Sequence, residues 1–172
     1  MKKILGKMVA AIVVVLLIVI FTCCSRPYTA EHATTGETVR DGRFIAYDNG
    51  TVLDTKTNLM WAAKDNGSDI KWQDAKFYCE NYRAGGYKDW RMPTLDELER
   101  LYDASKSRPG ACNRSFDIHV ATEFINITCV ASWASEIRGS DAAYLSFGSG
   151  RRYWGPQSSE ISTRMLPVRS SK

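Results

Sequence analysis

Hydrophobic residues recur at helical spacing in the segment 72–83. The residues that would share one face of this helix are Trp72, Ala75, Cys79 and Tyr82. A stripe that repeats every three to four positions is typical of an amphipathic helix packed on a core. Gly85 and Gly86 predict where the helix ends, because glycine takes the left-handed conformation of a C-cap without strain.

A second helix is predicted from Leu95 to about Ala104. Its inward face would consist of Leu95, Leu98, Leu101 and Tyr102. Thr94 and Glu97 have the spacing of a capping box, in which each side chain accepts a hydrogen bond from the other residue's backbone amide. The segment 85–94 is therefore predicted to be an extended piece that joins the end of one helix to the start of the next.

Short hydrophobic runs predict strands on both sides of these helices. Before them, residues 43–61 form a predicted meander of three strands, and the turn Asp48-Asn49-Gly50 suits a hairpin because it tolerates positive φ. After the helices, strands are predicted at 129–134, 143–147, 151–154 and 164–169, and the last should pair near the start of the domain. Strands that flank two helices predict an α+β fold with an antiparallel sheet.

The first 24 residues predict a signal peptide or membrane anchor. A basic start precedes an uninterrupted apolar run of 15 residues from Met8 to Thr22, as in an export signal. Cys23 and Cys24 follow directly, which is typical of a bacterial lipoprotein signal whose cysteine becomes lipidated. An uncleaved anchor and ordinary cleavage near Ala30 are the alternatives. All three interpretations place the domain outside the cytoplasm, and the lipoprotein signal predicts that it is anchored to the membrane in the cell envelope.

Composition changes after this segment. Residues 25–42 are polar and predict a flexible tether, and residues 43–170 are predicted to form the globular domain. The chain has a net charge of +4, but three of its lysines lie in the export segment, which leaves 20 basic and 19 acidic residues. No basic face is visible in this nearly neutral remainder, so nucleic-acid binding is not expected.

Three cysteines remain after the export segment: Cys79, Cys112 and Cys129. In an oxidising compartment at least one pair is expected to form a disulfide. Cys112 and Cys129 are the predicted pair because they flank one irregular stretch, whereas Cys79 lies in a predicted helix as a small buried residue. No cysteine or histidine spacing typical of zinc is present, so neither a metal nor a cofactor is predicted.

Several motifs resemble those of one family. The chain carries DNGTVLD at 48–54, NLMW at 58–61, GYKDWRMPT at 86–94 and SWAS at 132–135. These are similar to motifs of the Lcl C-terminal domain family of bacterial exported proteins, over roughly residues 43–169. The founding adhesin of that family binds sulfated polysaccharide, so the resemblance implies a binding role at the cell surface.

Two positions depart from this family, and one motif points further. Pro167 stands where many relatives carry a cysteine that could pair with Cys79, and Asn58 replaces a glycine, which asparagine's tolerance of the left-handed region permits. The run RMPT at 91–94 is also similar to a motif of the formylglycine-generating-enzyme family. That similarity implies a C-type-lectin-like scaffold, with two helices packed on a twisted antiparallel sheet. No cysteine follows Cys129 here, unlike in those enzymes, so their activity is not carried over.

Most residues whose side chains could act in catalysis or metal binding have a simpler structural explanation. His119 is the only histidine in the predicted domain, and no nucleophile or acid is predicted beside it. Asp96, Glu97 and Glu99 are expected to cap the second helix or face solvent instead of forming a catalytic pair. The turn 48–50 lacks the further ligands of a calcium loop.

Arginines and aromatic residues near one turn form the best candidate site. Four tryptophans are predicted in core positions: Trp61, Trp72, Trp90 and Trp133. The predicted ligand-binding residues are Arg138, Arg151, Arg152, Tyr153 and Trp154. Arginine forks bind sulfate or carboxylate groups, and aromatic faces bind sugar rings or cations. The alternative is an ordinary hairpin with solvated arginines.

The sequence thus predicts an exported, lipid-anchored, non-catalytic domain of the cell envelope. Its expected partners are a polysaccharide or an envelope protein, and the membrane through the N-terminal anchor. One alternative is an enzyme on the related scaffold, which would need a bound metal or an accessible thiol of low pKa at Cys79. The other alternative is a structural component of an envelope assembly.

Overall fold

The computed structural model describes residues 36–112, 115–160 and 162–172. Residues 35–172 form one compact unit. The predicted export segment, with Cys23 and Cys24, and the first part of the tether lie outside the described residues. Within the described part of the chain, no helix is long and apolar enough to cross a membrane.

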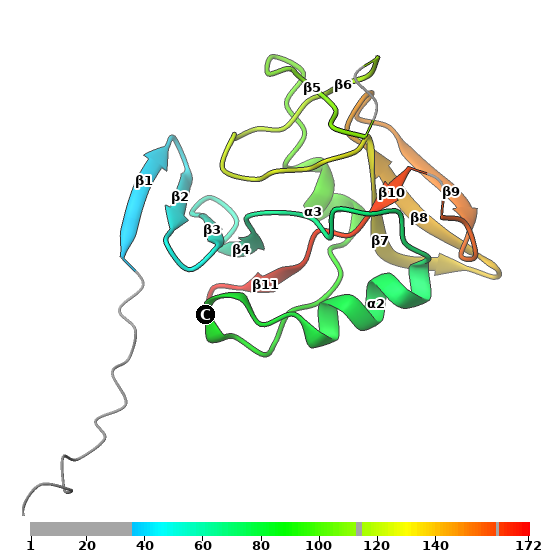
Figure 1. The fold of residues 1–172 in the computed structure, drawn as a ribbon, viewed down its shortest axis with the longest axis horizontal. Helices are drawn as coiled ribbons and strands as arrows, with labels where there is room; N and C mark the ends of the chain where they lie inside the picture. Colours follow the sequence, from blue (N-terminus) through cyan, green and yellow to red (C-terminus); the bar gives the residue numbers. More distant parts are fainter. Residues whose placement is uncertain (1–35, 113–114, 161) are drawn as a thin grey trace, which may run out of the picture. The chain divides into compact units, whose positions relative to one another are not determined.

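A five-stranded antiparallel sheet joins the two ends of the unit (Figure 1). Its strands, in spatial order, are β1 (Glu37–Asp41), β2 (Phe44–Tyr47), β3 (Thr51–Asp54), β4 (Leu59–Ala62) and β11 (Val168–Ser170). The predicted meander is confirmed in β2, β3 and β4. The C-terminal strand pairs with β4, so that Val168 opposes Trp61. The end of the chain therefore closes on the start of the domain, as the sequence predicts.

The first strand, β1, lies inside the stretch 25–42 that is predicted as a tether. Asp41 opposes Phe44 across a two-residue turn, in which Gly42 has a φ of +56°. Such hairpin turns need positive φ, which glycine adopts without strain. The ordered sheet therefore begins at Glu37, ahead of the predicted boundary at residue 43.

The second sheet has the order β10-β7-β8-β9. The strands β7 (Ala131–Arg138), β8 (Asp141–Ser146) and β9 (Arg152–Pro156) are antiparallel, whereas β10 (Thr163–Arg164) runs parallel to β7. The single strand predicted over 164–169 is therefore divided between two sheets as β10 and β11. Pro167 lies between them and lacks the N–H that a continuous ladder needs. A small third sheet pairs β5 (Arg108–Pro109) with β6 (Asp117–Ile118).

Two α-helices lie near the predicted positions. The first, α2, spans Trp72–Asn81, and the 3-10 turn η1 (Ala84–Gly86) follows it. The second, α3 (Leu95–Glu99), begins with the predicted capping box: Thr94 and Glu97 exchange hydrogen bonds of 2.8 and 3.2 Å.

The helix α3 is shorter than predicted because the chain after it pairs with another segment. The amide of Ala121 donates to the carbonyl of Leu101 at 2.7 Å, and Tyr102 forms an isolated bridge with Val120. These bonds use backbone groups that a longer helix would need. The apolar positions keep their predicted role, since Leu98 and Leu101 are fully buried.

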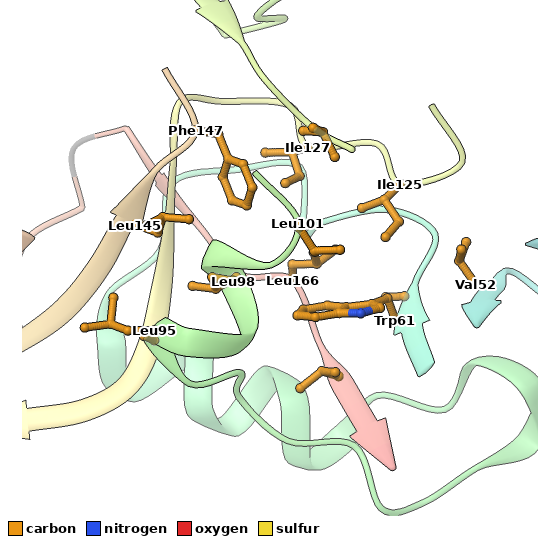
Figure 2. Packing of buried hydrophobic residues seen from close by; sticks show 14 of the residues in the cluster. Val52, Trp61, Leu95, Leu98, Leu101, Ile125, Ile127, Leu145, Phe147 and Leu166 are labelled. Atoms are coloured by element: carbon orange, nitrogen blue, oxygen red, sulfur yellow. The ribbon is translucent and has the colours of Figure 1, made fainter. Parts of the chain in front are cut away.

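Buried side chains form two clusters on opposite faces of the second sheet. The larger cluster joins α3 to both large sheets, and Figure 2 shows Leu101 and Leu166 beside the ring of Trp61. The smaller cluster lies under α2 and includes Cys79 and Trp133. The mixed α+β class with antiparallel sheets is thereby confirmed. Both clusters consist of residues of this unit, so we expect residues 35–172 to fold independently.

Candidate functional site

The strand β9 (Arg152–Pro156) carries three of the five predicted binding residues, Arg152, Tyr153 and Trp154, and Arg151 directly precedes it. It is an edge strand of the second sheet (Figure 1). Arg152 and Trp154 pair with Leu145 and Ala143, which belong to the cluster around α3, whereas Tyr153 pairs with Tyr144 on the α2 side. Successive side chains of a strand point to opposite faces. The predicted cluster is thus divided between two faces of one edge strand.

On the α3 face, the structure brings Arg138 and Trp154 together. The guanidinium carbon of Arg138 lies 4.7 Å from the centroid of the Trp154 ring. Ala143 lies opposite Trp154 in the ladder, and its small side chain leaves room for this stack. The indole of Trp154 remains 38% exposed. The Arg138 guanidinium therefore lies over one face of the Trp154 ring, and the part of Trp154 that stays exposed is available to a ligand.

Arg152, on the same face, is already paired. Its Nη2 lies 2.7 Å from Oδ1 of Asp96 and 2.5 Å from Oε2 of Glu99. The pKa of Arg152 is raised, mainly by the hydrogen bond to Glu99 and to a smaller extent by the hydrogen bond to Asp96. This arginine links β9 to α3 and has little capacity left for an anionic ligand. This link could not be predicted from the sequence, because the two carboxylates lie more than 50 positions from Arg152. Acidic residues at these positions are also typical of a solvated helix surface.

On the α2 face, Tyr153 continues a row of aromatic rings. It stacks on Tyr144 with centroids 5.4 Å apart, and Tyr144 meets Trp133 edge-on at 5.6 Å. Trp133 is buried, and its indole N–H donates to the carbonyl of Ile70 at 2.7 Å. The row is therefore held firmly at its inner end, while Tyr153 is 39% exposed at its outer end.

Arg151 precedes β9 and is exposed. Its carbonyl accepts a hydrogen bond from the amide of Ser146 at 2.9 Å, so its backbone is part of the hairpin. Among the residues that the structure describes, no carboxylate pairs with its guanidinium. By alternation along the strand it shares a face with Tyr153. This second face thus also carries an aromatic ring and an arginine.

The other tryptophans are structural. Trp61, Trp90 and Trp133 are buried as predicted. Trp72 is only half-buried, and its indole N–H donates to the carbonyl of Ala134 at 2.8 Å. It lines a groove of about 430 Å³ together with Lys76, Cys79, Trp90 and Met92. The sequence did not predict this groove, because α2 and the segment around Met92 contribute separate walls.

The motif GYKDWRMPT stabilises the fold by contacts with the C-terminus. Arg169 pairs with both carboxylate oxygens of Asp89, at 2.7 and 3.0 Å, and its guanidinium lies 3.9 Å from the ring centroid of Tyr87. The hydrogen bond from Arg169 lowers the pKa of Asp89. Arg91 binds Glu97 through two bonds of 2.7 and 2.6 Å. These motif residues therefore hold chain segments together and leave few free groups for chemistry.

Histidine and free cysteine lie in separate environments. His119 is half-buried, with Nδ1 2.7 Å from the carbonyl oxygen of Lys106 and its ring beside Tyr102. Cys79 lies on the buried face of α2, and burial raises the pKa of its thiol. Over the described ranges, no group of three histidine, cysteine or acidic residues is arranged to hold a metal ion.

The predicted disulfide is present. Cys112 and Cys129 are bonded, with Cα atoms 5.2 Å apart, while Cys79 is free. Disulfides persist in oxidising compartments. The bond therefore indicates an extracytoplasmic domain.

A comparison with models of known protein families finds a match for most of the chain. The sequence profile of the Lcl C-terminal domain matches residues 50–169. Comparison with curated proteins finds no match. The matched range contains both α-helices, the disulfide and all five predicted binding residues. By this match over more than half of its length, the chain belongs to the Lcl C-terminal domain family.

Proposed function

We propose that this protein is a non-catalytic binding domain of the cell envelope that recognises an anionic polysaccharide. The proposed site, called the β9 rim below, consists of Arg138 and Trp154 on one face and Arg151 and Tyr153 on the other. The observation that carries the proposal is the exposure of two aromatic rings, 38% and 39%, on opposite faces of one edge strand. Each ring shares its face with an arginine.

The chemistry of the β9 rim suits an anionic sugar chain. Aromatic faces pack on sugar rings, and guanidinium groups form paired hydrogen bonds with sulfate or carboxylate groups. Tyr153 is held by the stack that leads to Trp133, so its ring is ordered before a ligand arrives. Arg152 has a supporting role in this proposal, because Asp96 and Glu99 already occupy its guanidinium.

A binding role is favoured over the alternative of an enzyme. A nucleophilic thiol needs exposure and a lowered pKa. Cys79 has neither, since it is buried and burial raises its pKa. The proposal includes a C-type-lectin-like scaffold, supported by the paired terminal strands and the two helices on one sheet. It also includes a lipid anchor at Cys23 or Cys24, which would hold the domain at the membrane.

The test compares a charge-matched pair of double variants of residues 35–172. Arg138→Ala with Arg151→Ala removes both free rim arginines. Arg83→Ala with Lys88→Ala removes the same charge from an exposed loop. With immobilised heparin as the probe, the rim variant should lose about tenfold in affinity, and the loop variant less than about twofold.

Two further measurements define the outcome. The melting temperature of the rim variant should match that of the wild type, because exposed arginines contribute little to stability. The loop variant should melt slightly lower, because Arg83 donates hydrogen bonds to the carbonyls of Glu80 and Tyr82. Desulfated heparin should bind more weakly than heparin. Equal heparin affinity for the rim variant and the wild type would remove the β9 rim as the site, and binding to a protein instead of a glycan would redirect the proposal to the alternative partner.

A further inference from the structure

A cavity of about 520 Å³ lies beside the β5–β6 hairpin and shares no lining residue with the β9 rim. Its volume is within the range of small-molecule sites, about 300–1,000 Å³. Ile118, Val120 and Phe124 form its apolar wall, and the first two are almost fully buried. The cavity therefore offers a ligand apolar surface in addition to polar groups.

Arg108 uses only part of its hydrogen-bonding capacity in this cavity. It is half-buried, and its Nη2 donates to the carbonyl of Ile125 at 2.8 Å. Within the described part of the chain, it forms no ion pair with a carboxylate. Burial lowers the pKa of Arg108, and the charges of Glu123 and Asp65 offset this only in part. A guanidinium that has lost water without gaining an anion is suited to bind one.

The remaining charges of the lining restrict what can bind. Lys106 is already paired with Asp41 at 3.2 Å, so these two charges compensate each other. Glu123 is exposed at the same cavity. A ligand with one negative charge would satisfy Arg108, whereas a second negative charge would be repelled by Glu123. The lining therefore disfavours polyanions, in contrast to the β9 rim.

We infer that this cavity binds a small organic monocarboxylate with an apolar body. The carboxylate accepts hydrogen bonds from the guanidinium N–H groups of Arg108, and the body packs on Val120 and Phe124. The inference is independent of the β9 rim, because the two sites share no residue and prefer different ligands.

The test uses isocaproate and hydrocinnamate with residues 35–172, each compared with its own primary amide. The amides keep the shape of the ligands and lose the charge. Chemical shifts of backbone amides, followed at neutral pH, should show saturable binding of both acids with the largest changes in residues 118–124. The amides should bind about tenfold more weakly, because a neutral amide cannot form the charged pair. Glutarate, with two charges, should also bind more weakly.

Substitutions at Arg108 locate the site. Arg108→Met removes the charge and keeps the apolar stem, so the affinity for both acids should fall about tenfold or more. Arg83→Met is the matched control, since it removes an exposed arginine that belongs to neither proposed site and should change the affinity less than about twofold. Arg108→Lys keeps the charge but loses the fork and should give an intermediate affinity.

Three results would overturn the inference. The first is the absence of saturable binding by either acid at concentrations up to about 20 mM. The second is equal binding of acid and amide by the wild-type protein, which decides the question even if the Arg108 variants fail to fold. The third is an unchanged affinity in Arg108→Met.

Discussion

Opening the disulfide between Cys112 and Cys129 should lower the free energy of unfolding by about 3 kcal/mol. The bond joins residues 17 positions apart. Closing a loop of this length removes about 11 cal/mol/K of entropy from the unfolded chain, which corresponds to about 3 kcal/mol at 25 °C. In the folded state, the backbone hydrogen bond from Cys112 to Thr128, at 2.9 Å, remains possible without the disulfide. The loss should therefore arise mainly in the unfolded state.

The measurement is urea unfolding of residues 35–172, followed by tryptophan fluorescence. The double variant Cys112→Ala with Cys129→Ala is compared with the wild type under oxidising and reducing conditions. Alanine is chosen at position 129 because that side chain is fully buried, and a serine hydroxyl there would add a desolvation cost. With a urea m-value of about 1–3 kcal/mol/M, the midpoint should fall by about 1–3 M. The m-value should rise, because the unfolded chain without the crosslink exposes more surface.

Reductant provides the control and the refutation. Reduced wild type should unfold close to the double variant, and reductant should leave the double variant unchanged. A loss well below about 1 kcal/mol, with the disulfide confirmed by mass, would refute the loop-entropy argument. It would mean that the unfolded chain is already restricted between these positions.

Three further predictions concern electrostatics and reactivity. Burial acts to raise the pKa of Glu97, but hydrogen bonds from Arg91 and the Thr94 amide outweigh this effect, so the pKa is lowered in the folded state. The contribution of ionised Glu97 to the free energy of unfolding is therefore complete above the unfolded pKa of about 4.3, and it is lost as the pH falls through the folded pKa. Acid unfolding of Glu97→Gln should therefore begin from a lower stability at neutral pH and show a shallower decline below about pH 4, and an unchanged acid limb would contradict the assigned role. Arg152→Ala should leave heparin affinity within about twofold of the wild type, because its guanidinium is already paired, and a tenfold loss would return it to the binding site. Cys79 should react with a thiol reagent only under unfolding conditions, and rapid labelling of the native protein would revive the enzymatic alternative.

Local signals in the sequence were sufficient for most elements of the fold. The capping box at Thr94 and Glu97 requires only residues that are neighbours along the chain, and it forms as predicted. The turn at residues 48–50 and the apolar stripe of α2 are equally local. The disulfide pairing followed from compartment and loop position together, and it is also present.

Contacts between distant segments decided the rest. The end of α3 depends on the amide of Ala121, which binds a carbonyl from 20 positions earlier in the chain. Part of the predicted tether is a strand, because the turn at Gly42 lets residues 37–41 pair with β2. The polar composition of this segment does not reveal that pairing.

The candidate sites show the same division most clearly. The sequence alone determined which residues near the last hairpin could bind an anion or a sugar, since residue type sets that chemistry. Only the tertiary structure decided that Asp96 and Glu99 pair with Arg152 and that Arg138 reaches Trp154. It also decided that Arg108 lines a cavity in which no carboxylate of the described residues pairs with it. The physical reason is that the charge and shape of a side chain are properties of one residue, whereas its free hydrogen-bonding capacity depends on every segment packed around it.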